Sequence, residues 1–339
     1  MEQRMLGRTG VSVSKLCLGA MMFGAWGNPD HDDSVRIIHR ALDAGINFID
    51  TADAYSAGES EQIVAKALKG RRDDVVLATK VHFPIDDEPN HRGNSRRWII
   101  TEVENSLRRL QTDWIDLYQI HRPEPQTDID ETLGALSDLV HQGKIRYFGH
   151  SSFPASEIVE AQWTSERRGR ERFRSEQPSY SILVRALEHD VLPTCERYGI
   201  GVISYSPLAG GWLSGRWRKQ TGQQASMRAE RLPDRFDLSL PANQRKLDAA
   251  EQLALLAEQT GISLIEMAIA FVLRHPAVTS AIIGPRTMEH LESQLSAADV
   301  VLSDDVLDRI DEIATPGVTI NSADNGWVQP SLTAEARRR

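Results

Sequence analysis

Short apolar runs alternate with amphipathic segments along most of the 339-residue chain. Eight of the runs have the β-rich composition of buried strands. These predicted strands are KLCLG (15–19), NFIDTA (47–52), VVLATKV (75–81), DLYQIH (116–121), IRYFGHS (145–151), EQPSYSI (176–182), GVISYSP (201–207) and AVTSAIIG (277–284). Helical periodicity follows each of them, at 32–44, 59–69, 96–110, 130–142, 155–168, 187–198, the pair 245–259 and 263–274, and 288–297. Several of these predicted helices end at a glycine, a common C-terminal signal.

Eight strand–helix units predict an α/β protein with a (β/α)8 TIM barrel, in preference to a doubly wound sheet. The segment MLGRTGVSVS predicts an N-terminal β-hairpin that turns at Arg8-Thr9-Gly10. Residues 213–244 are polar and weakly periodic, so we expect a long loop after the seventh strand that could fold over a bound ligand. No repeat or linker divides the chain, which predicts a single barrel domain over 1–339, with extra helices and a flexible tail from about 328 to 339.

Composition narrows the classes of partner. The formal net charge is -9, with a pI near 5.6, which opposes binding to nucleic acid and to anionic membranes. Cys17 and Cys195 form neither a disulfide framework nor a metal knuckle, and buried free thiols in a reducing cytosol are the expected reading. No apolar leader and no apolar run of about 18 residues is present, so we expect a cytoplasmic protein. No His, Cys and Asp cluster has the spacing of a metal site.

Polar residues end three of the apolar runs. Asp50, Lys80 and His121 lie at or near these ends, and Tyr55 follows Asp50 by five residues. All strands of a parallel barrel open on one face, so these four side chains are expected to converge there. A phenol, an ammonium, a carboxylate and an imidazole are what proton and hydride chemistry on a carbonyl needs. Each residue alone has a structural explanation, as a cap, a turn histidine or packing, but the joint spacing favours catalysis.

A dinucleotide fingerprint is missing from the chain. Gly199-Ile200-Gly201 enters a strand instead of leaving one and lacks the third glycine. Other candidates lie at strand ends: Ser151, Ser152, Gln177, Tyr205, Ser206 and Arg286-Thr287. Hydroxyl and amide groups, an aromatic face and a cation before a helix suit a nicotinamide and a phosphate. Singly, Ser151 and Gln177 could instead be polar barrel residues, and Tyr205 could be packing.

The chain resembles the aldo-keto reductase superfamily over nearly its whole length. The resemblance runs from LGRTGVSVSKLCLGAMMFG through FIDTADAY, LATK, DLYQIHRP, GHSSF, YSPLAGG and IIGPRTMEHLESQL. Asp50, Tyr55, Lys80 and His121 match the catalytic tetrad of that superfamily position by position. The forms YSPLAGG and IIGPRTMEHL are more similar to the bacterial reductases and the potassium-channel β-subunit branch than to the vertebrate aldose reductases.

The resemblance implies a role for each matched residue. Tyr55 would be the general acid, with its pKa lowered by Lys80, while Asp50 would hold Lys80 and His121 would orient the carbonyl. The implied cofactor is NADP(H), and the residues implied to contact it are Ser151, Ser152, Gln177, Tyr205, Ser206, Leu208, Gly210, Gly284, Arg286 and Gln294. Two pairs depart from the family pattern: Ser151-Ser152 stands where Ser-Asn is common, and Ser293-Gln294 where Glu-Asn is common.

These expectations lead to two functional hypotheses. The first is an NADPH-dependent reductase of an aldehyde or ketone, whose partner is a small carbonyl compound. The alternative is a nucleotide-binding regulatory or redox-reporting subunit with slow turnover. The residues expected to wall a substrate pocket are Met22, Phe23, Trp26, Phe83 and Trp212, with Trp327 as a further candidate. Packing in the core is an equally good interpretation for several of these residues. The sequence does not determine the substrate or the oligomeric state.

Overall fold

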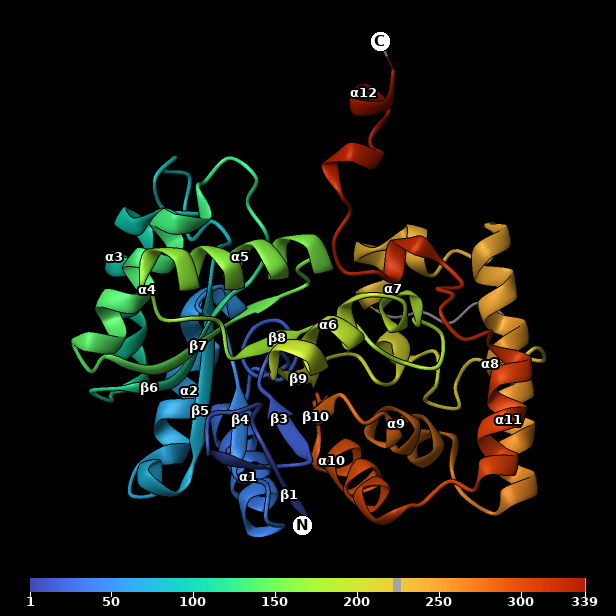
Figure 1. Cartoon of the computed structure of the whole chain (residues 1–339). Coiled ribbons are helices and arrows are strands. Elements are labelled where there is room, and N and C mark those ends of the chain that lie inside the picture. The colour runs from blue at the N-terminus through green and yellow to red at the C-terminus, as the bar shows by residue number, and fades with distance from the viewer. Residues whose placement is uncertain (222–226, 339) are drawn as a thin grey trace.

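Eight parallel strands close into a barrel in the computed structural model, which describes residues 1–221 and 227–338 (Figure 1). The strand order is β10-β3-β4-β5-β6-β7-β8-β9, which confirms the (β/α)8 prediction. The strands are β3 (Leu16–Gly19), β4 (Phe48–Asp50), β5 (Val76–Val81), β6 (Ile115–Ile120), β7 (Ile145–Ser151), β8 (Ser175–Gln177), β9 (Gly201–Ser204) and β10 (Val278–Ile283). The register pairs Lys80 with Gln119 and Ser151 with Gln177, so polar side chains far apart in sequence meet at one end.

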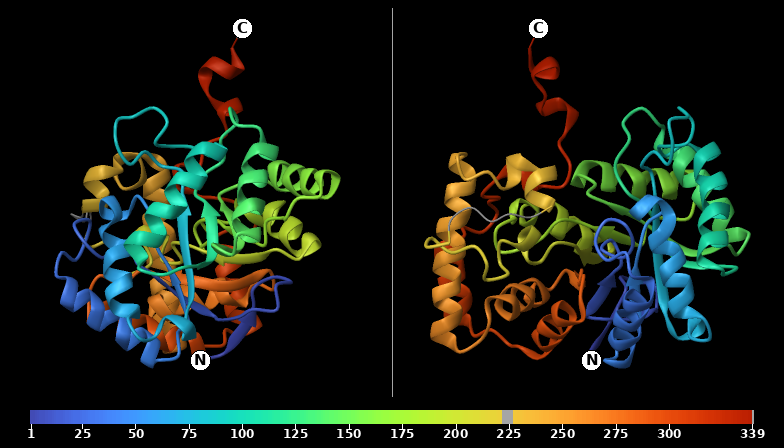
Figure 2. Two further views of the ribbon diagram at one scale, coloured as in Figure 1. Left: turned by 90° about the vertical axis from the view of Figure 1, so that its left-hand side faces the viewer. Right: turned by 180° about the vertical axis from the view of Figure 1, so that it is seen from behind.

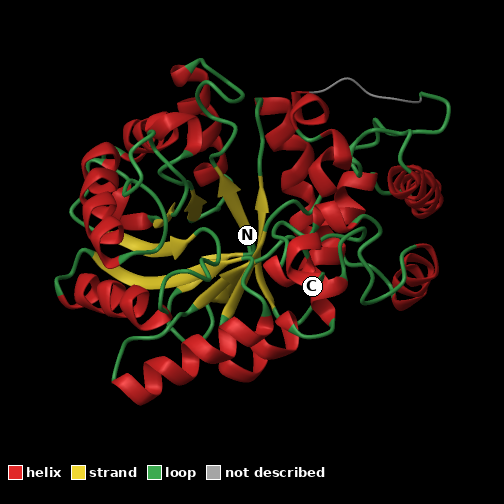
Figure 3. Ribbon diagram, turned by 90° about the horizontal axis from the view of Figure 1, so that it is seen from above, coloured by secondary structure: helices red, strands yellow, loops and turns green. Residues whose placement is uncertain are grey.

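Helices surround the barrel, as the views in Figures 2 and 3 show. They are α1 (His31–Asp43), α2 (Glu59–Leu68), α3 (Arg96–Leu110), α4 (Ile129–His141), α5 (Ala155–Arg168), α6 (Val191–Tyr198), α7 (Met227–Arg231), α8 (Pro241–Thr260), α9 (Leu264–Arg274), α10 (Met288–Leu295), α11 (Asp304–Ile313) and α12 (Ala334–Arg337). The short 3₁₀ helices are η1 (Tyr55–Gly58), η2 (Arg72–Asp74), η3 (Ala186–Glu188), η4 (Ala209–Gly211), η5 (Pro233–Arg235), η6 (Ser296–Asp299), η7 (Ser322–Asp324) and η8 (Pro330–Leu332).

Side chains in the sequence cap many of these helices. Asp30 accepts a hydrogen bond from the backbone N–H of Asp33 at the start of α1. Ser263 and Glu266 form a reciprocal capping box on α9, which satisfies two otherwise unpaired backbone groups. Gly169 and Gly261 end α5 and α8 in the left-handed conformation, as the glycine signals indicated.

The predicted N-terminal hairpin closes one end of the barrel. Its strands β1 (Gln3–Met5) and β2 (Ser12–Ser14) are antiparallel. Leu6, directly after β1, and Val13, in β2, are buried in one cluster with residues from inside the barrel. The barrel members of that cluster are Cys17, Phe48, Ala78, Leu117, Ile203 and Ile282. Among the described residues, the hairpin thus covers this end of the barrel and leaves the carboxyl-terminal face of the strands for a ligand.

A second, larger core lies between the strands and the helices. Cys195 is buried in this layer, and both cysteines are free thiols in the structure, which agrees with the sequence interpretation. Within residues 1–221 and 227–338, no single helix is long and apolar enough to cross a membrane, although α8 and α9 together, bent by 95°, pass the same test of length and composition.

Several element boundaries differ from the prediction. The sixth strand stops at Gln177 because Pro178 has no N–H for a further ladder bond. The predicted helix 187–198 is divided into η3 and α6. Inside the predicted loop 213–244 lie α7, η5 and the start of α8, while residues 222–226 are outside the described part of the chain. Helix α11 was not predicted, and the expected tail contains η8 and α12; its flexibility stays a prediction.

Candidate active site

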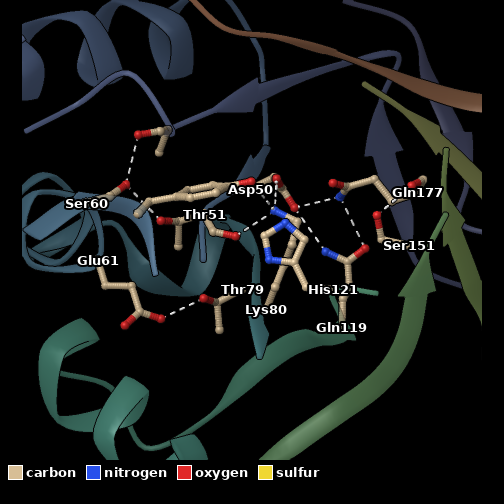
Figure 4. Close-up of polar contacts among 12 residues, drawn as sticks. Asp50, Thr51, Ser60, Glu61, Thr79, Lys80, Gln119, His121, Ser151 and Gln177 are labelled. Carbon is tan, nitrogen blue, oxygen red and sulfur yellow. Dashed lines mark hydrogen bonds and ion pairs between the residues drawn. The ribbon is translucent and has the colours of Figure 1, made fainter. Parts of the chain in front are cut away.

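Asp50, Lys80 and His121 lie together at the carboxyl ends of β4, β5 and β6 (Figure 4), and Tyr55 opens η1 shortly after β4. Lys80 is the centre of the group: its Nζ donates to Asp50 Oδ2 at 2.5 Å and to Tyr55 Oη at 3.2 Å. A third bond runs from Lys80 Nζ to the carbonyl oxygen of Thr51 at 2.8 Å. The side chain of Lys80 has no exposed surface, and that of Asp50 is 4% exposed. The structure thus brings the predicted carboxylate, ammonium and phenol into one buried chain of contacts.

A tight turn after β4 carries Tyr55 back over the strand ends. Tyr55 opens η1, and the next two residues, Ser56 and Ala57, have φ values of 49° and 55°. This left-handed backbone is costly for residues with a Cβ, and such strain is often found at functional sites. Ser60 holds the turn in place through two contacts of its Oγ atom. This atom lies 2.9 Å from Thr51 Oγ1 and donates to the carbonyl oxygen of Ala20 at 2.8 Å.

Two glutamines hold the other oxygen of Asp50. The Nε2 atoms of Gln119 and Gln177 donate to Asp50 Oδ1 at 3.0 and 2.8 Å. Gln177 Nε2 also lies 3.2 Å from Gln119 Oε1, so the two amides orient each other. Gln119 was not among the predicted site residues. The available signal was its position as a polar residue within the apolar run DLYQIH, on the strand that ends at His121.

Burial and neighbouring charges together determine the protonation states of Tyr55 and Lys80. It raises the pKa of Tyr55, and the opposing charge of Lys80 reduces that rise without reversing it. The expected lowering of the Tyr55 pKa by Lys80 therefore only partly offsets the rise caused by burial. The pKa of Lys80 is raised because Asp50 and Tyr55 outweigh its burial. The phenol is consequently protonated and the ammonium charged at neutral pH.

His121 is a neutral imidazole beside the tyrosine. Burial and the positive charges of Lys80 and Arg122 hold its pKa well below the usual range. Its ring centroid lies 5.7 Å from that of Tyr55 and 4.7 Å from that of Phe83. The Nδ1 atom of His121 is buried and has no hydrogen-bond partner in residues 1–221 and 227–338. An unpaired buried ring nitrogen is costly unless a ligand or water completes it.

The residues predicted to hold a nicotinamide are grouped beside the tetrad. Ser151 Oγ donates to the carbonyl oxygen of Gln177 at 2.8 Å, and Ser152 Oγ lies 3.4 Å from Tyr205 Oη. Gln177 turns its NH₂ toward Asp50, which leaves its side-chain oxygen as an acceptor. Ser152 has a φ of 59°. Asparagine, which is common at this position in the resembled family, adopts this left-handed conformation more readily than serine. Their contacts with a cofactor stay a prediction.

The predicted phosphate residues lie at the ends of β9 and β10. Ser206 and Gly210 have φ values of 57° and 71°, and Leu208, which precedes η4, is packed against the core. At Gly284 an added Cβ would meet nothing within 4 Å, so space for a ligand adjoins β10. Arg286 lies two residues after Gly284, just before Thr287, which caps α10. The remaining candidate, Gln294, is buried, and its Nε2 donates to the carbonyl oxygen of His290 at 2.6 Å.

Three residues of the predicted substrate wall lie at or near the catalytic candidates and stay a prediction, and the other two are wrong because they are buried in the core. Trp26 and Phe83 lie beside Tyr55 and His121, with the Trp26 and Tyr55 ring centroids 5.9 Å apart. Met22 lies on the same β3–α1 connection as Trp26 and is partly buried. By contrast, Phe23 and Trp212 are fully buried in the hydrophobic core, so neither presents a surface to a substrate. Trp212 instead stacks on Trp217, with ring centroids 4.0 Å apart.

A C-terminal strap, defined as residues 321–327, lies against this site. Asp324 in the strap is buried and pairs with Lys246 Nζ at 2.7 Å and Arg235 Nε at 2.5 Å. Gly326 has a φ of 82°, and a Cβ at this position would collide with the hydroxyl of Tyr205. The strap therefore touches the residue expected to stack on the nicotinamide. Trp327, the substrate-pocket candidate in this segment, is partly exposed.

Comparisons with known proteins show the family to which the chain belongs. Residues 15–315 match the family model described as the aldo/keto reductase family. The uncharacterized oxidoreductase YrpG of Bacillus subtilis is 41% identical over 325 residues, which covers 92% of this chain and 96% of that protein. The versiconal hemiacetal acetate reductase of Aspergillus parasiticus is 33% identical over 342 residues, covering 93% and 98%. A probable voltage-gated potassium channel subunit beta of Oryza sativa is 33% identical over 321 residues, covering 92% and 96%.

Proposed function

Because the chain belongs to the aldo/keto reductase family, and relatives of matching length are named oxidoreductases, we propose that it reduces an aldehyde or ketone to an alcohol with NADPH. The observation that supports this most strongly is the buried contact of Lys80 with both Asp50 and Tyr55, beside a neutral His121. This arrangement can present a protonated phenol to a carbonyl oxygen. We further propose the cytoplasm as its location, consistent with its acidic charge.

The residues fit a nicotinamide dinucleotide. Gln177 has a free acceptor oxygen, open space adjoins Gly284, and His121 Nδ1 is a buried nitrogen without a partner among the described residues. Ser151, Ser152 and Gln177 would hold the carboxamide, Tyr205 would pack on the ring, and Ser206, Leu208, Gly210 and Arg286 would hold the phosphates. When bound, the dinucleotide would supply the hydride.

The chain's own groups would handle the proton. Tyr55 would donate its phenolic proton to the carbonyl oxygen, and Lys80 would stabilise the resulting phenolate across the 3.2 Å contact. Asp50, held by Gln119 and Gln177, would keep the ammonium in place. His121, as a neutral imidazole, would donate a hydrogen bond to the same carbonyl oxygen and so orient it. The raised pKa of Tyr55 keeps the proton on the phenol until the substrate arrives.

A preference for NADPH over NADH rests on Arg286. A guanidinium beside a helix N-terminus suits the 2′-phosphate, which only NADPH carries. Arg286→Ala should weaken NADPH binding by about ten- to a hundredfold and leave NADH binding nearly unchanged. Fluorescence titration of the two cofactors measures this. Equal losses for both would assign Arg286 a structural role.

A panel of aldehydes and ketones tests the activity itself. Purified protein should oxidise NADPH continuously, with a rate that depends on the carbonyl compound, as followed at the nicotinamide absorbance. No carbonyl-dependent oxidation with any compound of the panel would contradict the proposal.

The second candidate function is a regulatory or redox-reporting subunit. It is favoured by the similarity to the rice protein named as a probable potassium channel subunit beta. Such a subunit would hold the nucleotide tightly and turn over slowly. A single burst of cofactor oxidation without steady turnover would support it, whereas sustained turnover supports the reductase.

A further inference from the structure

Arg122, directly after His121, brings a positive charge to the mouth of the barrel. It follows β6 (Ile115–Ile120), and its side chain is only partly buried. The NH1 atom donates to the carbonyl oxygen of His121 at 2.5 Å and to Ser151 Oγ at 3.2 Å. Its Cζ atom lies 5.7 Å from the centre of the Phe83 ring, which itself packs on His121. Arg122 thus lies with the catalytic residues, held at one end of its guanidinium.

The rest of the guanidinium has no partner in the described chain. NH1 uses its two hydrogens in the two bonds above, so three N–H groups on NH2 and Nε remain. Within residues 1–221 and 227–338, no carboxylate lies within 4.0 Å of Arg122. The nearby Glu124 is engaged elsewhere, since it accepts from the backbone N–H of Asn94 at 2.7 Å and from Thr127 Oγ1. Lys80, in contrast, is neutralised by Asp50.

The positive charge of Arg122 affects the pKa of both His121 and Tyr55. It contributes to the low pKa of His121 and opposes the rise in the pKa of Tyr55. Because Lys80 is paired with Asp50 and Arg122 has no ion-pair partner among the described residues, the guanidinium at the mouth is open to an anionic ligand. A negative group on the ligand would compensate it, and a guanidinium fork is well shaped for a carboxylate or a phosphate.

The residues that would hold the cofactor's phosphates lie away from Arg122. In the closed order β10-β3-β4-β5-β6-β7-β8-β9, the strand β6 stands four positions from β10, on the far side of the barrel. Gly284 and Arg286, the expected phosphate residues, follow β10. A negative group on the carbonyl substrate is therefore better placed than the cofactor's phosphates to meet Arg122.

We propose that Arg122 selects carbonyl substrates that carry a carboxylate or a phosphate. The carbonyl oxygen would meet Tyr55 and His121, while the anionic group would bind the free side of the Arg122 guanidinium. This inference rests on the proposed reductase function and deepens it by naming the substrate class. Met22, Trp26 and Phe83 would contact the part of the substrate between the two polar ends.

A matched pair of aldehydes tests the proposal. 4-Carboxybenzaldehyde and its methyl ester present the same ring and aldehyde, and only the acid is charged at pH 7. The preference of the wild type is the kcat/KM value for the acid divided by that for the ester. Dividing this preference by the same ratio for Arg122→Met removes the difference in intrinsic reactivity between the two aldehydes. The quotient should be about ten to a hundred, the range for one charge-assisted contact. Arg122→Lys, which keeps the charge but loses the fork, should give an intermediate preference.

A second pair distinguishes the two anions. The ratio of kcat/KM for glycolaldehyde phosphate to that for glycolaldehyde is compared with the acid-to-ester ratio of the benzaldehyde pair. A larger ratio for the phosphate pair indicates that the natural anionic group is a phosphate. A smaller ratio indicates a carboxylate. Arg274→Met is the control, because Arg274 is exposed at the end of α9 near the opposite face and the variant loses the same charge. This control should retain the wild-type ratios.

The possible failures are distinguishable. If wild type reduces the ester and glycolaldehyde but shows equal ratios in wild type and Arg122→Met, the reductase function stands and the role of Arg122 is wrong. If no aldehyde is reduced, the proposed function fails. Arg122 is then judged by calorimetric titration of 4-carboxybenzaldehyde into the protein with NADP⁺, where wild type should bind at least tenfold more tightly than Arg122→Met. Equal affinity in that titration would overturn the inference.

Discussion

The ammonium of Lys80 lies 3.2 Å from the hydroxyl of Tyr55, and the two residues reach this contact from different elements of the barrel. Lys80 is inside β5, whereas Tyr55 begins the short helix after β4. The contact places a positive charge where a phenolate would form during proton donation. It also makes the tyrosine and the lysine separately testable.

Tyr55→Phe should lower kcat by at least about a hundredfold, because it removes the proposed proton donor and little volume. Cofactor affinity should stay near the wild-type value. Steady-state kinetics and a fluorescence titration measure the two effects. Tyr198→Phe, on α6, is a matched control that should retain full activity. Near-normal turnover of the Tyr55 variant would remove this residue from the mechanism.

Lys80→Met should lower turnover at neutral pH at least as much as Asp50→Asn does. Methionine keeps the apolar stem but removes the charge that stabilises a phenolate, whereas asparagine loosens the lysine without discharging it. Turnover at neutral pH gives the order, and circular dichroism establishes that both variants are folded. A folded Lys80→Met protein with the wild-type rate would contradict the proposed acid chemistry.

The buried pair of Lys246 and Asp324 predicts a pH-dependent stability. Burial lowers the pKa of Lys246 to about 8, below its ordinary value of 10.5. Between these two pH values the unfolded chain binds the lysine proton and the folded chain does not, so the free energy of unfolding rises with pH. Across the window the wild type should gain on the order of 3 kcal/mol relative to Lys246→Met. Urea unfolding at pH 7.5, 9 and 10.5 measures this, and a constant difference would refute the buried titration.

Gly326→Ala should impair cofactor binding beyond its effect on stability. The left-handed backbone of Gly326 costs about 1–2 kcal/mol for alanine, and the new Cβ would also push on Tyr205. Gly261→Ala, at the end of α8, carries the same backbone cost with nothing within 4 Å of its Cβ. We expect at least about a tenfold loss of NADPH affinity for Gly326→Ala and none for Gly261→Ala. Equal affinities in the two variants would show that the strap does not position Tyr205.

Local patterns in the sequence were sufficient to predict the barrel and to select the four candidate catalytic residues. The alternation of β-rich runs with amphipathic segments determined eight strand–helix units, because burial of a strand on both faces requires apolar residues throughout. Asp50, Lys80 and His121 could be identified because each interrupts or ends such a run, and Tyr55 because it follows Asp50 at the spacing of the resembled family. Chain direction in a parallel barrel then brought them to one face.

Contacts between distant segments were decided only by the tertiary structure. Gln119 and Gln177, 58 residues apart, share one oxygen of Asp50, a relationship that no local pattern encodes. Phe23 and Trp212 are as apolar as Trp26 and Phe83, but packing of the whole chain buries the first two and leaves the others beside Tyr55 and His121. The strap reaches Tyr205 because Asp324 pairs with Lys246, 78 residues earlier. Hydropathy and spacing describe one segment at a time, whereas the exposure and charge of a side chain depend on which other segments fold against it.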